Sequence, residues 1–284
     1  MKPYNIKEIP MQDSATMKRP LLKYFSLTYL IFFVLFGMTG GAIALKMVEP
    51  IPDILQVVCA WSPTFSFLIL YKKLVPDLTL GEFIRRQFRA KAGKGLLFAV
   101  GLQMLVFITM VVLISIVNRI TMLMVINTSA AVLVLGFFNQ LIRGPLGEEI
   151  GWRGYAQNQL QKTHSPLVSS LILGAVWGLW HAPLWFVTTG YAGGQLVQYI
   201  ALFLVGILSI SVIMTYFYNK SKNLLIPIVM HQLLNYLGSV IEADGLQIMF
   251  YMSMLYLAAA LVLVVVNPHK VLFSGSLVKK YTEL

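Results

Sequence analysis

A run without a single charged residue, 95-GLLFAVGLQMLVFITMVVLISIV-117, sets the fold class of this sequence. A helix needs roughly 20 consecutive apolar residues to cross the hydrocarbon core of a bilayer, so this run predicts a transmembrane helix. Comparable apolar stretches, separated by polar breaks, lie near 24–45, 54–71, 130–150, 166–186, 196–218, 224–240 and 246–266.

These stretches together predict an all-α protein, a polytopic membrane bundle of about eight transmembrane helices. We expect residues 1–284 to form a single transmembrane domain, with a core at about 130–240 that carries the motifs described below. The fourth stretch continues as a polar helical end from Tyr155 to Lys162. That end must be wet or enclosed by protein, because lipid offers its polar groups no partners.

The composition excludes a water-soluble protein and argues against a nucleic-acid partner. Hydrophobic residues make up 58% of the chain and charged residues only 12%, which is too little charge to cover a soluble surface. The net charge of +11 could indicate nucleic-acid binding. However, the basic residues stand in short clusters beside apolar stretches, which is the pattern that positive-inside topology produces. The expected partner is therefore the lipid bilayer.

The basic clusters also predict the orientation of the chain. With eight spans they fall on one side of the membrane, which the positive-inside rule identifies as the cytoplasmic side. We therefore predict a multi-pass protein of the cell membrane with both termini cytoplasmic. The residues behind this prediction are Lys2, Lys7, Lys18, Arg19 and Lys23; Lys72, Lys73, Arg85, Arg86, Arg89, Lys91 and Lys94; Lys162; Lys220 and Lys222; and Lys270, Lys279 and Lys280.

A basic segment at about 78–94 has the pattern of an amphipathic helix. Its apolar residues Leu80, Phe83, Ile84 and Phe88 recur at helical spacing, and basic residues occupy the other side. This pattern predicts a helix that lies in the headgroup plane. A solvated basic loop that only fixes topology is the alternative.

The first group of polar residues within an apolar stretch is 147-GEEIGWR-153. Ionisable groups at membrane depth are expensive, so each is a candidate functional residue. On a helix Glu149 and Arg153 are four residues apart and can pair, whereas Glu148 is rotated by roughly 100° and faces elsewhere. One carboxylate is then neutralised and the other is left available. The alternative is a polar cluster that only marks the end of a span.

Two further polar groups lie in the fifth and seventh stretches. Trp177 and His181 share one helix face, as do His231 and Asn235, because each pair is four residues apart. A lone His181 could be a packing residue, and His231 with Asn235 could be polar contacts between helices. The first three stretches carry almost no ionisable group in mid-helix, and this asymmetry favours a site. His164 and His269 stand in polar connections and are expected at the surface.

These motifs, in this order, resemble those of the CAAX-processing and bacteriocin-processing intramembrane proteases, a family that includes the type II CAAX prenyl endopeptidases. The family patterns are EExxxR, an aromatic residue followed four later by histidine, and HxxxN. The aromatic residue here is tryptophan, whereas phenylalanine is more usual. A weaker motif of small residues belongs in the sixth span, among Gly206, Ser209 and Ser211. The matching residues are Glu148, Glu149 and Arg153; Trp177 and His181; and His231 and Asn235.

The resemblance implies an endopeptidase that hydrolyses a peptide bond in a membrane-associated peptide or protein. By analogy, Glu148 would act as general base on water, His181 would help to position that water, and His231 with Asn235 would hydrogen-bond the oxyanion. Glu149 and Arg153 would be a supporting pair. No cofactor is favoured, although zinc held by Glu148, His181 and His231 is an alternative.

Two other classes of function stay open at this stage. A non-catalytic bacteriocin-immunity or peptide-binding protein could use the same helices, since a fold does not guarantee turnover. A small transporter could use buried Glu and His as a proton relay, but no inverted repeat supports it. The sequence indicates neither whether the substrate is prenylated nor an oligomeric state.

Overall fold

The computed structural model describes residues 14–267 and 271–273, and the chain is helical throughout this part. One isolated bridge joins Ile126 to Ile241 in the connections before α6 and after α12. The predicted all-α class is confirmed. The helices are α1 (Ser14–Ala44), α2 (Ile51–Ala60), α3 (Ser62–Leu74), α4 (Leu80–Arg89), α5 (Gly93–Asn118), η1 (Met122–Val125), η2 (Ala131–Leu135), α6 (Gly136–Arg143), α7 (Pro145–Glu149), η3 (Ile150–Gln157), α8 (Asn158–Leu160), α9 (Pro166–Trp180), α10 (Ala182–Val187), α11 (Gly193–Ser221), α12 (Leu225–Ser239) and α13 (Gly245–Val266).

Four of these helices, α1, α5, α11 and α13, are long and apolar enough to cross a membrane. A fifth candidate is the pair α2 and α3, which is bent by 55°. The protein is thus an integral, multi-pass membrane protein. The other three predicted stretches, 130–150, 166–186 and 224–240, fold as helices that are broken or too short to meet the same test of length and hydropathy.

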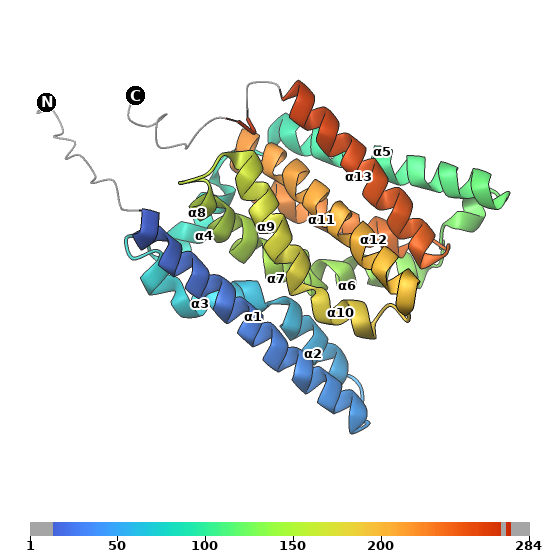
Figure 1. Ribbon diagram of the computed structural model, residues 1–284, viewed down its shortest axis with the longest axis horizontal. Helices are drawn as coiled ribbons and strands as arrows, with labels where there is room; N and C mark the ends of the chain where they lie inside the picture. The colour runs from blue at the N-terminus through green and yellow to red at the C-terminus, as the bar shows by residue number, and fades with distance from the viewer. Residues whose placement is uncertain (1–13, 268–270, 274–284) are drawn as a thin grey trace, which may run out of the picture.

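Long helices lie on two sides of the molecule, and α11 runs between them with the shorter helices (Figure 1). Helix α1 packs along α2 and α3 on one side, and α13 packs with α5 and α11 on the other. Between them, α11 packs on α9, and α12 contacts α5, α6 and α7. Helix α7 also contacts α3, so this short segment is enclosed from several directions.

The π-helical segment η3 is enclosed by protein. Every residue from Gly151 to Gln157 is buried. Two glycines allow this closeness, since a Cβ atom on Gly147 would lie 2.6 Å from the Trp61 ring, and one on Gly151 would collide with Tyr24 Oη. The polar helical end 155–162, expected to be wet or enclosed by protein, is enclosed by protein over most of its length.

Helix α4 occupies part of the segment predicted to be amphipathic. Thr79 caps its first turn, because its hydroxyl accepts a bond from the Glu82 amide while its own amide donates to the Glu82 carboxylate. Of its side chains Phe83 is buried, whereas Arg85, Arg86 and Arg89 are exposed. The Leu224 amide donates to the Gln87 carbonyl at 2.8 Å, which attaches α4 to the connection between α11 and α12.

Several residues that support the predicted orientation lie outside the described part of the chain. They are Lys2, Lys7, Lys270, Lys279 and Lys280, and His269 lies outside it as well.

Candidate active site

A break in the helical backbone at Gly144 begins the site. Helix α6 ends at Arg143, and Pro145 has no amide hydrogen to continue it. The Gly144 carbonyl instead accepts bonds from the amides of Gly147 and Glu148, both at 3.0 Å, and α7 starts there. The freed Ile142 carbonyl accepts a bond from Trp61 Nε1 at 2.9 Å. The new helix axis carries both carboxylates of the motif into the protein interior.

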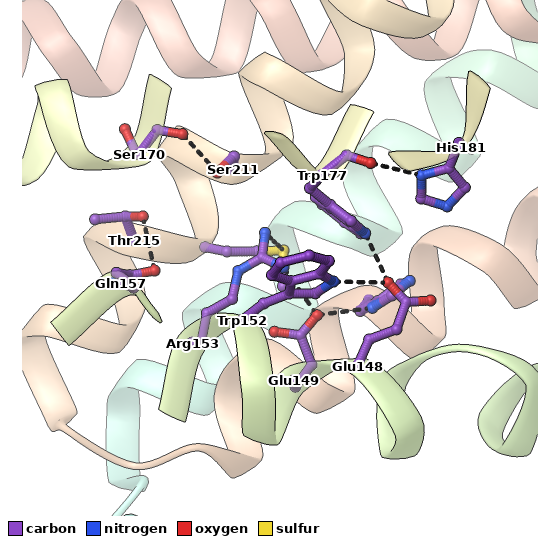
Figure 2. Close-up of polar contacts among 12 residues, drawn as sticks. Glu148, Glu149, Trp152, Arg153, Gln157, Ser170, Trp177, His181, Ser211 and Thr215 are labelled. Carbon is purple, nitrogen blue, oxygen red and sulfur yellow. Dashed lines mark hydrogen bonds and ion pairs between the residues drawn. The ribbon is translucent and has the colours of Figure 1, made fainter. Parts of the chain in front are cut away.

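Glu148 is almost completely buried and is held through one of its oxygens (Figure 2). Its Oε2 accepts a bond from Trp177 Nε1 at 2.6 Å and a longer one from Trp152 Nε1 at 3.3 Å. Among the described residues nothing donates to Oε1. The contact with Trp152 was not predicted, although Trp152 follows Glu148 by four residues and the spacing rule used for Glu149 and Arg153 would have found it.

Glu149 connects two other site residues. Its Oε1 accepts a bond from Arg153 Nη1 at 3.0 Å, which confirms the predicted pair, and lies 2.8 Å from His231 Nδ1. Arg153 is completely buried and also donates to Met214 Sδ at 3.6 Å. Its guanidinium carbon lies 4.2 Å from the centre of the Trp177 ring. Trp177 therefore contacts both the cation and, through its indole nitrogen, Glu148.

His181 lies where α9 gives way to α10. Its amide donates to the carbonyl of Gly178, three residues back, so the Trp177 carbonyl loses its usual helical partner. The His181 ring takes that place, with Nδ1 at 2.8 Å from the Trp177 oxygen. A carbonyl oxygen only accepts, so Nδ1 carries the hydrogen and Nε2 is left for another partner.

His231 and Asn235 stand one turn apart on α12 and face Gly144. The Cβ position of Gly144 lies 2.8 Å from Asn235 Nδ2, 3.4 Å from His231 Nε2 and 3.6 Å from Glu148 Oε1. Three polar atoms from two helices therefore approach Gly144 closely, which the absence of a side chain there permits. A carboxylate oxygen of Glu149 accepts the Nδ1 hydrogen of His231, so Nε2 is the nitrogen that faces Gly144.

The four predicted catalytic residues, Glu148, His181, His231 and Asn235, line one cavity of about 350 Å³. The supporting pair Glu149 and Arg153 lies outside this lining. Of the small residues considered on the sixth span, Gly206 is a lining residue, and Ser211 instead donates to the Ser170 carbonyl at 2.8 Å. The remaining wall is mostly apolar and comes from α11, α12 and α13. It includes Phe203, Ile207, Ile210, Leu234, Ile248, Met249 and Met252.

The residues proposed for zinc do not form a ligand cluster. Within residues 14–267 and 271–273 no group of three or more His, Cys, Asp and Glu side chains is placed to hold a metal ion. Glu148, His181 and His231 thus do not fit a zinc site as they lie. His164, which was expected at the surface, is partly buried and contacts the Thr163 hydroxyl at 2.8 Å.

The match to known proteins covers the same segment as the site. Residues 128–237 match the family model for type II CAAX prenyl endopeptidase Rce1-like proteins. A protein named CAAX prenyl protease 2, from Methanococcus maripaludis, is 38% identical over 92 residues. That match covers 31% of this chain and 34% of the relative, so it spans about a third of the relative's length. The resemblance inferred from the motifs is confirmed for this segment.

Proposed function

We propose that this chain is an intramembrane endopeptidase that hydrolyses a peptide bond in a membrane-associated peptide or protein. Its segment 128–237 matches the family model for type II CAAX prenyl endopeptidase Rce1-like proteins. One observation carries the proposal. Glu148 Oε1, His231 Nε2 and Asn235 Nδ2 converge beside Gly144, and all three residues line the same cavity. A base and hydrogen-bond donors around one reacting atom are what peptide hydrolysis requires.

Glu148 is the proposed general base. The two indole donors hold Oε2, which leaves Oε1 to take a proton from a water molecule as that water attacks the peptide carbonyl carbon. His181 Nε2, which also faces the cavity, would accept the second hydrogen of the water and so orient it.

His231 and Asn235 are the proposed donors to the oxyanion. The Asn235 amide donates as it stands, whereas His231 Nε2 donates only when its ring is protonated, because Nδ1 already carries a hydrogen.

The name of the relative, CAAX prenyl protease 2, suggests a prenylated peptide of the CAAX type as the first substrate to test. The apolar walls from α11 and α13 suit aliphatic side chains beside the cleaved bond. We further propose that α4 lies in the headgroup plane and that both termini are cytoplasmic, since the exposed Arg85, Arg86 and Arg89 would then meet anionic lipid.

The substitution Glu148→Gln tests the base, because glutamine keeps the shape and can still accept both indole bonds. We expect cleavage of a farnesylated peptide in proteoliposomes to fall by about 10²–10⁴-fold, the usual contribution of a general base. Glu49→Gln changes an exposed carboxylate in the same way and should leave the rate unchanged. Full activity in a folded Glu148→Gln protein would reject this base. Equal peptide binding by both proteins without any cleavage would favour a non-catalytic binding protein.

We propose that catalysis needs no metal, and this is tested separately. Activity should persist after chelation, and metal analysis of the purified protein should give no stoichiometric zinc. Stoichiometric zinc whose removal abolishes cleavage would contradict this proposal.

A further inference from the structure

Arg143 is a lining residue of the catalytic cavity to which the mechanism above gives no role. It is the last residue of α6 and directly precedes Gly144, so their Cα atoms are about 3.8 Å apart. Among the described residues that line the cavity, Arg143 is the one with a permanent positive charge. This placement raises two possible roles for Arg143, one in the fold and one in substrate binding.

The contacts of Arg143 resemble those that an arginine makes with a bound carboxylate. Its Nη1 donates to Gln56 Oε1 at 2.7 Å and its Nη2 to Asp53 Oδ1 at 2.8 Å. Two oxygen atoms thus meet two guanidinium nitrogens, which is how arginine binds a carboxylate in a bidentate manner. The Arg143 Nε is buried and has no partner among the described residues, so the group has a donor to spare.

The present partner of Arg143 is easily displaced. The side chain of Asp53 is 57% exposed and that of Arg143 is 28% exposed. Ion pairs this open to solvent contribute about 0–1 kcal/mol, so a ligand with a better-placed carboxylate can replace Asp53 at small cost. By contrast, the buried Arg153 is held by Glu149 and by the face of Trp177, and is not available in this way.

We propose that Arg143 binds the free C-terminal carboxylate of the substrate and that Asp53 occupies its place when the site is empty. This inference rests on the proposed peptidase function. An extended peptide advances at most about 3.6 Å per residue, so a carboxylate fixed on Arg143 puts the cleaved bond a short, constant distance from the chain end. Arg143 would thereby select substrates with a free terminus and set the position of cleavage.

The test compares two farnesylated peptides that differ only at the C-terminus, one a free acid and one an amide. A hydrogen-bonded charge is worth about 1.5–3 kcal/mol, so the wild type should prefer the acid in kcat/KM by roughly 10–100-fold. In Arg143→Gln this preference should vanish. Arg143→Lys keeps the charge but loses the two parallel N–H donors of the guanidinium, so it should keep a reduced preference for the acid.

Asp53→Asn separates this role from a structural one. It removes the competing carboxylate while keeping a side chain of the same size, so KM for the acid peptide should fall. If the Asp53–Arg143 pair only fastened α2 to α6, losing either partner would impair the protein in the same direction. A rise in KM for Asp53→Asn, or an acid preference that survives in Arg143→Gln, would overturn the proposal.

The two peptides should also be measured as ligands of the Glu148→Gln protein, by fluorescence anisotropy. If the wild type cleaves neither peptide, the peptidase function fails. Tighter binding of the acid, lost on adding Arg143→Gln, would still support Arg143 as the carboxylate-binding residue. Equal binding of the acid and the amide would reject it, whatever the turnover.

Discussion

The helices that carry the site differ from the helices that face lipid in length and in enclosure. In α13, an uninterrupted helix from Gly245 to Val266, only 17% of the span is buried within the protein. In η3 every residue from Gly151 to Gln157 is buried, including the charged Arg153. The bundle thus leaves most of α1, α5 and α13 outside its core and encloses its charges in protein, where partners for them can be provided.

The enclosed helices are also the broken ones, and the breaks themselves supply polar contacts. A helix interrupted within a membrane leaves backbone carbonyls without partners, which lipid cannot satisfy. Here Trp61 takes the freed carbonyl of Ile142, and His181 takes that of Trp177. The break between α9 and α10 therefore fixes the orientation of the His181 ring. The lipid-facing helices need no such partners, because their backbones are continuous.

The largest expected effect comes from breaking the enclosed charge pair with Arg153→Met. The change leaves Glu149 buried without its cation, and removing one partner of a buried ion pair typically costs about 3–5 kcal/mol. Unfolding of the protein in detergent micelles would measure the loss. Arg85→Met removes an exposed arginine from α4 and should change stability by less than about 0.5 kcal/mol.

The double variant Glu149→Gln/Arg153→Met sharpens the same comparison. It removes both charges, so it should be more stable than Arg153→Met alone. If Arg153→Met were as stable as the wild type, the charge pair would not matter and the enclosed helices would not differ from the exposed ones in this respect.

The sequence predicts the lipid-facing half of the molecule better than the enclosed half. Long apolar stretches are sufficient to identify the lipid-facing α1, α5 and α13, because lipid demands little beyond length and hydropathy. They also identify α11, although residues 209–218 of that helix are buried. Hydropathy alone does not reveal the breaks. A local signal was nevertheless present, since Pro63, Pro145 and Pro183 each follow a break by one or two residues.

Within the site, the contacts inside one helix were predictable and those between helices were not. Spacing alone pairs Glu149 with Arg153. The bond from Glu149 to His231 joins residues 82 positions apart, and no periodicity encodes it. The same holds for the contacts of Arg143, which join α6 to α2, and for Gly144, whose importance lies in the side chains that surround it.

The next effect in size concerns the space beside Gly144. In Gly144→Ala the added methyl group would lie 2.8 Å from Asn235 Nδ2 and would push this amide out of its present position. Displacing catalytic groups by about 1 Å can cost about 100-fold in rate, and we expect kcat/KM to fall by that order. Gly136→Ala on α6 is the matched control, because its Cβ meets nothing within 4 Å. Equal activities of the two variants would contradict the proposed role of Asn235.

The smallest effect compares a glycine between two helices with a glycine that faces lipid. A Cβ atom on Gly178 of α9 would lie 2.9 Å from Ile207 Cγ2 and 3.1 Å from Leu204 Cδ2, whereas one on the exposed Gly101 of α5 would meet nothing within 4 Å. Overpacking typically costs about 1–3 kcal/mol, and only Leu204 Cδ2 is the far end of a flexible side chain, since χ1 alone fixes Ile207 Cγ2. Gly101→Ala should instead stabilise its helix by up to about 1 kcal/mol, since alanine is the better helix former. Unfolding in micelles would therefore show shifts of opposite sign, and shifts of the same sign would mean that α9 and α11 are not as closely packed as the enclosed half requires.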